Sequence, residues 1–339
     1  MERKIEGVLN LFPKSRRSHL PGWLSLKRFL TLILMCVMAG IALSGCGLAN
    51  ETAGVESAIV ILPAATIGMT ATQRSSSTAT STMVVATFTL APSSTLTSTA
   101  SVTSLPDIGS SRIREADGML QVYVPEGEFM MGSNEGDLDE QPVHAVYLDA
   151  YWIDQTEVTN AMFALCVQSG VCDKPICDTY EDSAFAAYPV GCITWEMAKL
   201  YCAWAGSRLP TEAEWEKAAR GLDGRKYPWG NNFADQSLLN YGQYEEGAVP
   251  VGSYPEGASP YGALDMAGNV WEWVADWYDE GYYVKSNYEN TQGPPSGTLR
   301  SVRGGAYDLG ERYARTSHRL GFNPVGMFSS NGFRCLSSP

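Results

Sequence analysis

Residues 191–230 read GCITWEMAKLYCAWAGSRLPTEAEWEKAARGLDGRKYPWG, and this stretch decides the fold. Apolar residues recur at helical spacing after Thr194 and end at Gly206, which predicts one capped amphipathic helix. The apolar positions of that helix are Met197, Leu200, Tyr201 and Trp204. Thr211 and Glu214 then form a capping-box pattern, which predicts the start of a second helix. By themselves these signals indicate two helices of an α+β domain.

Other motifs follow in a fixed order, namely YPWGN, DMAGNVWEWVADW, RGGAY and GFRC, and GEFMMGS, PVH, LDAYWID and EVTN come before. In this order, over residues 127–335, the chain resembles the formylglycine-generating enzyme family, also called sulfatase-modifying factors. The resemblance implies an α+β domain of the C-type-lectin-like kind. Such a domain is rich in loops, has short strands and a few helices, and is stapled by disulfides.

The first 46 residues have the pattern of an export signal. A basic segment, residues 1–28, precedes an apolar run at residues 29–45, which is short for a membrane-spanning helix but suits a signal-peptide core. The run ends in LSGC, which resembles a bacterial lipobox with Cys46 as the lipid-bearing residue. An uncleaved N-terminal anchor is the alternative. Both predict an exported, membrane-anchored protein that faces the periplasm or the cell exterior.

Residues 47–111 are dominated by Ser, Thr and Ala. Such a composition cannot bury enough apolar surface to offset the entropy of ordering, so a disordered tether is predicted, with a typical span of about 45 Å. The folded domain is expected at residues 112–339. Alternating residues in 119–133 and 142–154 predict short strands, and residues 157–170 predict a helix capped by Thr159 or Asn160.

Six of the eight cysteines lie in the predicted domain. An even number in an exported domain favours disulfides. The resemblance implies that Cys202 pairs with Cys335. The other four allow three pairings and are expected to staple residues 166–192 to themselves; they are Cys166, Cys172, Cys177 and Cys192. A zinc site at Cys172 and Cys177 is the alternative.

The segment ALDMAGNVWEWVADW offers hard oxygen ligands of the kind that calcium prefers. The resemblance implies a structural calcium ion held by Asp265, Gly268, Val270 and Glu272. A second family calcium uses residues that match Asn240 and Tyr241, but the loop that follows is shorter here and leaves its carboxylate ligand in doubt. The alternative for the first set is that its two carboxylates only accept hydrogen bonds from backbone amides.

The resembled enzymes oxidise a substrate cysteine and hold copper with two cysteines of their own, shortly after the RGG motif. Residues 303–322, RGGAYDLGERYARTSHRLGF, contain no cysteine. Leu309 stands at the first position, and the second falls near Tyr313 or Ala314. Because copper(I) requires polarisable sulfur, copper is not expected. An iron-dependent oxygenase would need a histidine cluster, and the predicted domain has only two histidines.

Charged residues remain in this segment. Arg312, Arg315 and His318 are a possible ligand surface, whereas Arg303 and Arg319 are expected to brace the loops. The net charge of −13 argues against nucleic acid as a partner. The expected partners are a membrane, through the N-terminal lipid, and a protein, peptide or glycan ligand.

The sequence therefore predicts a surface-tethered lipoprotein. Its sulfatase-modifying-factor-like domain lacks the copper cysteines and is expected to work as a calcium-stabilised binding or accessory module. The alternative is an oxidoreductase of the same superfamily with different metal chemistry. Sequence alone leaves open whether the chain is an enzyme.

Overall fold

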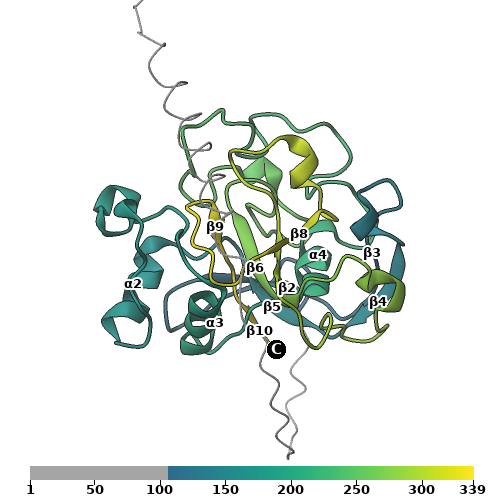
Figure 1. Ribbon diagram of the computed structural model, residues 1–339, viewed down its shortest axis with the longest axis horizontal. Coiled ribbons are helices and arrows are strands. Elements are labelled where there is room, and N and C mark those ends of the chain that lie inside the picture. Colours follow the sequence, from purple (N-terminus) through teal and green to yellow (C-terminus); the bar gives the residue numbers. More distant parts are fainter. Residues whose placement is uncertain (1–105) are drawn as a thin grey trace, which may run out of the picture. The chain divides into compact units, whose positions relative to one another are not determined.

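A computed structural model describes residues 106–339 of the chain (Figure 1). The predicted signal peptide, the lipobox with Cys46 and nearly all of the predicted tether lie outside the described residues. The first strand begins at Ser111, beside the boundary expected at residue 112. No helix in residues 106–339 has the length and apolar character needed to cross a membrane.

Short strands form three small sheets. The first sheet has the order β1-β2-β5-β10, from Ser111–Ile113, Leu120–Val124, Tyr151–Asp154 and Leu336–Ser337. The second is the antiparallel pair of β3, Gly127–Met131, and β4, His144–Leu148. The third has the order β8-β7-β6-β9, from Arg319–Phe322, Arg300–Arg303, Trp271–Trp277 and Asn331–Gly332. The strands expected in residues 119–133 and 142–154 are thus confirmed.

Three α-helices carry the predicted caps. They are α2, Asn160–Gln168, α3, Trp195–Trp204, and α4, Glu212–Arg220. Thr159 caps α2 and Thr194 caps α3, each by accepting a bond from the backbone amide three residues on. Thr211 and Glu214 form the expected capping box of α4. Single 3-10 turns lie at Leu138–Glu140, Asp178–Glu181, Ser183–Phe185, Pro255–Gly257, Tyr282–Lys285 and Glu311–Ala314.

One prediction about α3 is wrong. Leu200 was expected on the buried face, but it is 39% exposed. The buried positions are Trp195, Ala198, Tyr201 and Cys202. The helix is therefore rotated relative to the expected stripe, because Trp195 and the disulfide-bonded Cys202 define the face that meets the core.

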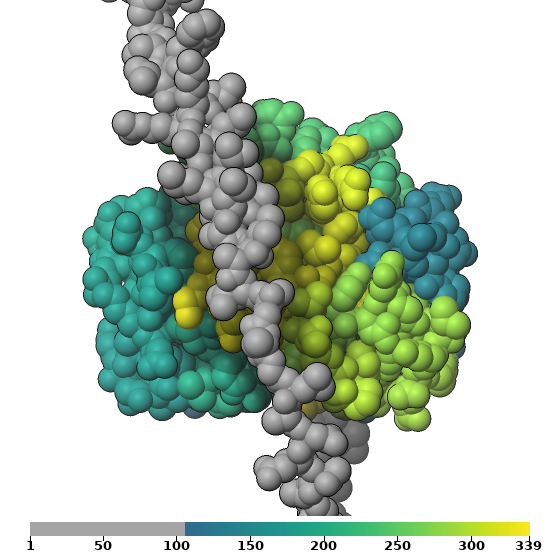
Figure 2. Space-filling view, in the orientation of Figure 1, coloured from purple at the N-terminus to yellow at the C-terminus, as the bar shows by residue number. Residues whose placement is uncertain are grey.

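In the described residues, the buried apolar side chains form two large clusters and one small cluster among the helices and sheets. Helices α2 and α3 lie on one side of the central strands, and the β3–β4 pair lies on the other, with α4 close to the centre (Figure 1). Every residue of α4 is buried. In the space-filling view, the residues of α2 and of the segment that follows it form one flank of the visible face (Figure 2).

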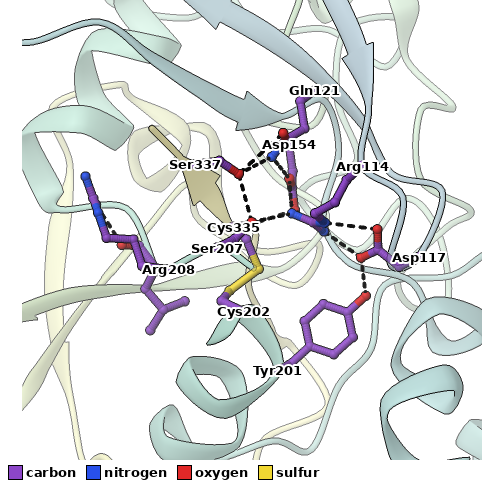
Figure 3. Close-up of a disulfide and its surroundings, with 11 residues drawn as sticks. Arg114, Asp117, Gln121, Asp154, Tyr201, Cys202, Ser207, Arg208, Cys335 and Ser337 are labelled. Atoms are coloured by element: carbon purple, nitrogen blue, oxygen red, sulfur yellow. Dashed lines mark hydrogen bonds and ion pairs between the residues drawn. A yellow bond between two sulfur atoms is a disulfide. The ribbon is translucent and has the colours of Figure 1, made fainter. Parts of the chain in front are cut away.

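The disulfide between Cys202 and Cys335 ties α3 to the C-terminal segment (Figure 3). Its sulfur atoms are 2.02 Å apart and it closes a sequence separation of 133 residues. Beside it, Arg114 donates to Asp117 at 2.6 Å and to Asp154 at 2.7 Å. Because the Cys335 amide also donates to Asp154, the chain end joins a buried polar cluster as well as the disulfide. The expected α+β, loop-rich and disulfide-stapled fold is confirmed.

Candidate functional site

The position at which the resemblance places copper is filled by hydrocarbon. Strand β7 ends at Arg303, and Gly304 and Gly305 turn the chain with φ values of 91° and 79°. A Cβ on Gly305 would lie 2.8 Å from the carbonyl oxygen of Tyr313, so the turn requires glycine. Leu309 and Tyr313 then pack against the main apolar cluster.

The thiols that remain in the domain are all used in disulfides. Cys166 pairs with Cys172, and Cys177 pairs with Cys192. The segment 166–192 is thus stapled to itself, as expected. Since Cys172 and Cys177 belong to different disulfides, neither sulfur is left as a thiolate for zinc. The described residues contain no unpaired cysteine.

The arginine–glutamate network consists of Glu212, Glu216, Arg303 and Arg319, all buried. The guanidinium group of Arg319 donates two hydrogen bonds to the carboxylate of Glu212, at 2.9 and 2.6 Å. Arg303 donates to Glu216 at 2.5 Å and to a backbone carbonyl oxygen at 2.7 Å. The bracing role expected for Arg303 and Arg319 is confirmed, and both side chains are buried away from solvent.

The three residues of the predicted ligand surface do converge, but on protein carboxylates. Arg315 forms ion pairs with both Asp137 and Glu140. The Nε2 atom of His318 lies 3.6 Å from Asp137, and Arg312 lies 3.8 Å from it with 61% of its side chain exposed. Because Arg315 pairs with both carboxylates, the cluster braces a loop, and its more exposed charges belong to Arg312 and Asp137.

His318 is held in its neutral form. Only 4% of it is exposed, and burial, together with the nearby guanidinium groups of Arg315 and Arg303, lowers its pKa to about 4. Its ring packs against Trp271 and Tyr313, with centroid distances of 5.7 and 5.1 Å. The residue therefore behaves as a packed aromatic ring rather than as a cation for an anionic ligand.

The expected calcium residues fit a cation unevenly. Both carboxylate oxygens of Glu272 accept a bond from Arg334, each at 2.7 Å, and one also accepts from Trp215 at 2.8 Å. Three of its roughly four acceptor sites are thus filled, so Glu272 fits poorly as a calcium ligand. Asp265 accepts a bond from the Gly252 amide at 2.6 Å, and burial raises its pKa.

The second calcium set fits better. Asn240 is 2% exposed, and its Oδ1 atom has no hydrogen-bond partner among the described residues. Its Nδ2 atom donates to the carbonyl oxygen of Gly247, so the short loop folds back over it. Tyr241 follows in the chain and is partly buried. A cation would satisfy the orphaned oxygen, which makes Asn240 the stronger anchor.

Sequence reasoning missed Glu157, which belongs to the same polar interior. It is fully buried, one of its oxygens accepts from Asn269 at 3.0 Å, and the other has no partner. Burial and the negative charges of Asp265 and Glu272 raise its pKa well above the usual range. The sequence marks it only as the first residue of EVTN, at the start of the helix predicted for residues 157–170.

A pocket of about 500 Å³, here named the acidic pocket, lies beside the segment that contains Leu309. It is lined by part of the stapled segment 166–192, by residues 245–249 and by Tyr307. The loops are joined, because the amides of Gly242 and Gln243 donate to the carbonyls of Leu309 and Tyr307, both at 2.8 Å. Apart from Cys177, named in the alternative zinc site, no residue of this pocket was predicted as a ligand, because its walls come from segments that lie far apart in the sequence.

The sequence of residues 109–339 matches the family described as the sulfatase-modifying factor enzyme 1-like domain. The chain belongs to this family. It is similar to the formylglycine-generating enzyme of Streptomyces coelicolor, with 34% identity over 278 residues that cover 64% of this chain and 88% of that enzyme.

Two further relatives of this sulfatase-modifying factor domain are informative. The serine/threonine-protein kinase pkn1 of Chlamydia caviae is 38% identical over 237 residues, which are 63% of this chain but 37% of the kinase. This chain therefore spans about a third of that relative. The solved structure of PvdO from Pseudomonas aeruginosa superposes with a TM-score of 0.60 at 24% identity, covering 69% of this chain and all of PvdO, and shows the same fold.

Proposed function

We propose that this sulfatase-modifying factor domain is a non-catalytic binding or accessory module. The observation that carries the proposal is that a partly buried Leu309 packs against the apolar core at the position of the first copper cysteine. Ala314, near the second position, is 2% exposed and also packs among apolar residues. The described residues hold no thiolate at which copper(I) chemistry would start.

The acidic pocket supports the binding part of the proposal. It is open, it adjoins the altered segment, and its acidic side chains pair with none of residues 106–339. A domain that has an open pocket but lacks the copper-binding cysteines can bind a ligand without oxidising it. The pocket is therefore the proposed ligand site.

The decisive experiment looks for the family's chemistry. Purified protein is incubated with copper, oxygen and a cysteine-containing sulfatase peptide, and the peptide is analysed by mass spectrometry. We expect no aldehyde. Aldehyde above a copper-only control would overturn the proposal. Metal-dependent oxygen consumption with iron or manganese in place of copper would favour the alternative oxidoreductase.

We further propose that the chain is a lipoprotein anchored through Cys46, on the basis of the LSGC motif and the basic and apolar segments before it. A Cys46→Ser variant should be released from the membrane fraction or migrate as an unprocessed form. Identical fractionation and mobility of variant and parent would refute lipid attachment at this residue.

Calcium is proposed as a structural ion near Asn240, with support from its buried, unpartnered Oδ1 atom. An ion that binds only the folded state stabilises it by mass action, by about 2.7 kcal/mol at a hundredfold excess over Kd. Chelation should therefore lower the melting temperature, and Asn240→Leu should reduce that response. A melt that does not change on chelation would contradict the proposal.

A further inference from the structure

The guanidinium group of Arg300 is held between two tryptophan rings. Its central carbon lies 3.6 Å from the centroid of the Trp195 ring and 3.5 Å from that of the Trp277 ring. Trp195 begins α3, Trp277 ends β6 and Arg300 begins β7, so the stack joins three elements of the fold. The indole of Trp195 is fixed in turn, because it donates to the carbonyl oxygen of Val274 at 2.8 Å. The position of Arg300 is therefore set before any ligand binds.

One edge of this guanidinium group has no partner within residues 106–339. The Nη1 atom of Arg300 donates to the carbonyl oxygen of Ala275 at 2.6 Å, and this is the one hydrogen bond of the side chain to a described residue. The Nε atom is buried and makes none. A buried N–H donor without an acceptor is costly, and Nε together with Nη2 forms an edge that can hold two oxygens of one anion.

Other arginines of the domain use this same edge to hold a carboxylate. The Nε and Nη2 atoms of Arg319 donate to Glu212, and those of Arg334 donate to Glu272. Burial acts to lower the pKa of an arginine, but the paired carboxylates raise the pKa of Arg319 and of Arg334. The pKa of Arg300 is lowered by its burial. Arg300 thus has the geometry of a carboxylate-binding arginine without the carboxylate.

Two acidic residues lie near Arg300 but form no ion pair with it, namely Asp276 and Glu196. Glu196 pairs instead with Lys199 at 3.1 Å. Asp276 is buried, and its burial together with the charge of Glu212 raises its pKa well above the usual range. The carboxyl group of Asp276 therefore contributes little negative charge, and Arg300 keeps its attraction for an external anion.

A pocket of about 560 Å³, here named the stack pocket, lies beside this arginine. Arg300 and Trp277 line it together with amide side chains and prolines, namely Asn287, Asn290, Gln292, Pro294 and Pro295. The lining includes no aspartate or glutamate. The side chains of Asn287 and Gln292 are exposed and are not hydrogen-bonded to any of residues 106–339. A side-chain amide both donates and accepts hydrogen bonds, as a sugar hydroxyl group does.

We infer that the stack pocket binds the carboxylate of an acidic saccharide, with Arg300 as the anion-binding residue. The free edge of Arg300 matches the two carboxylate oxygens, the amides match the hydroxyl groups, and the indole of Trp277 offers an apolar surface to the C–H groups of a sugar ring. A volume of about 560 Å³ accommodates a disaccharide. The stack pocket shares no lining residue with the acidic pocket, and the inference holds whether or not the domain is catalytic.

The test compares two disaccharides that differ at one group. Cellobiouronic acid carries a carboxylate where cellobiose carries a hydroxymethyl group, and the binding of each is measured by titration calorimetry. The acid should bind at least about tenfold more tightly, because a bidentate hydrogen bond between charged groups is stronger than one between neutral groups. The difference should shrink as salt is raised.

Variants locate the effect in the stack pocket. Arg300→Lys keeps the positive charge but removes the bidentate edge, and should weaken binding of cellobiouronic acid about tenfold. Because Arg300 also contributes to packing, a second test uses exposed positions. Asn287→Asp with Gln292→Glu places negative charge in the pocket lining, and should weaken binding of the acid at least about fivefold and of cellobiose less than about twofold. The control, Asn232→Asp with Gln236→Glu, adds the same charge at exposed positions outside the lining and should leave the binding of both within about twofold.

Three outcomes would overturn the inference. These are equal affinity for the two disaccharides, no binding of either at millimolar concentration, and an equal loss of acid binding in the two double variants. Undiminished binding of the acid by a folded Arg300→Lys variant would exclude Arg300 as the anion-binding residue. Acetyl-dialanine, a peptide with a free terminal carboxylate, tests the other source of this group. Its binding in the absence of cellobiouronic acid binding would overturn the saccharide assignment.

Discussion

Glu212 and Glu216 lie inside the domain, whereas Glu245 and Glu246 lie at its surface, and their surroundings differ accordingly. The two interior carboxylates meet guanidinium groups at 2.6 and 2.5 Å. The two surface carboxylates meet no described partner. A buried charge must be paired because desolvation penalises it, while an exposed charge can stay unpaired in water.

The comparison separates two uses of charge in one fold. The interior carboxylates and guanidinium groups pair with one another, so they are not free to bind a ligand. Removing one member of a pair destabilises the fold. The acidic pocket is open, so its charges contribute little to folding and remain available for recognition. Each of the following predictions tests one side of this division.

The largest effect is expected for the interior disulfide between Cys202 and Cys335. In the chain-entropy account, removing it with paired alanine substitutions destabilises the fold by about 5 kcal/mol, because it closes a separation of 133 residues. The control is the Cys166–Cys172 pair, with a separation of 6 and an expected cost of about 2 kcal/mol. Urea unfolding measures both, and equal losses would contradict the loop-length argument.

The next effect concerns the arginine–glutamate network. Arg319→Met leaves Glu212 buried with only a 3.4 Å contact to Arg303, and should cost about 3–5 kcal/mol in urea unfolding. Arg312→Met, at an exposed guanidinium, should cost less than about 1 kcal/mol. Adding Glu212→Gln to Arg319→Met should recover part of the loss. Equal stability of the two arginine variants would show that the network does not brace the fold.

A smaller effect, dependent on pH, is expected at His318. Its folded pKa is about 4, below the unfolded value near 6.5, so the unfolded chain binds the proton more tightly. Stability should therefore fall as pH drops from about 6.5 to 4, by about 3 kcal/mol from this residue. His318→Phe removes the titration, and the difference between the two unfolding curves isolates it. Parallel curves would mean that the pKa of His318 is the same in the folded and the unfolded states.

The smallest effect is expected at the acidic pocket itself. Glu245→Gln with Glu246→Gln should change the free energy of unfolding by no more than about 0.5 kcal/mol, because both side chains are exposed and form no ion pair with the described part of the chain. A loss above 1 kcal/mol in urea unfolding would show that these glutamates support the fold. The pocket would then resemble the interior network rather than contrast with it.

Local signals in the sequence were sufficient for much of the fold. The caps at Thr194 and Thr211 act within one turn of helix, and the strand patterns repeat every two residues, so neither depends on distant contacts. The rotation of α3 that exposes Leu200 was not predictable in this way. It depends on Trp195, whose indole donates to the carbonyl of Val274, a residue 79 positions away.

Leu309 shows what the sequence by itself determined. The absence of sulfur at residues 303–322 is a chemical fact that no folding can change, and it excludes a copper thiolate pair there. The family and the α+β class were likewise readable, because ordered motifs and local periodicity carry them.

Which charged side chains are paired within the protein depends on its tertiary structure. Arg315 and Glu245 look equally available in the sequence, yet Arg315 pairs with Asp137 and Glu140, 178 and 175 positions away, while Glu245 has no partner within residues 106–339. The acidic pocket likewise combines Asn160, Phe185 and Tyr307 from distant segments. Pairing and pocket formation are long-range events, set by how the loops pack, and so residue type alone does not reveal them.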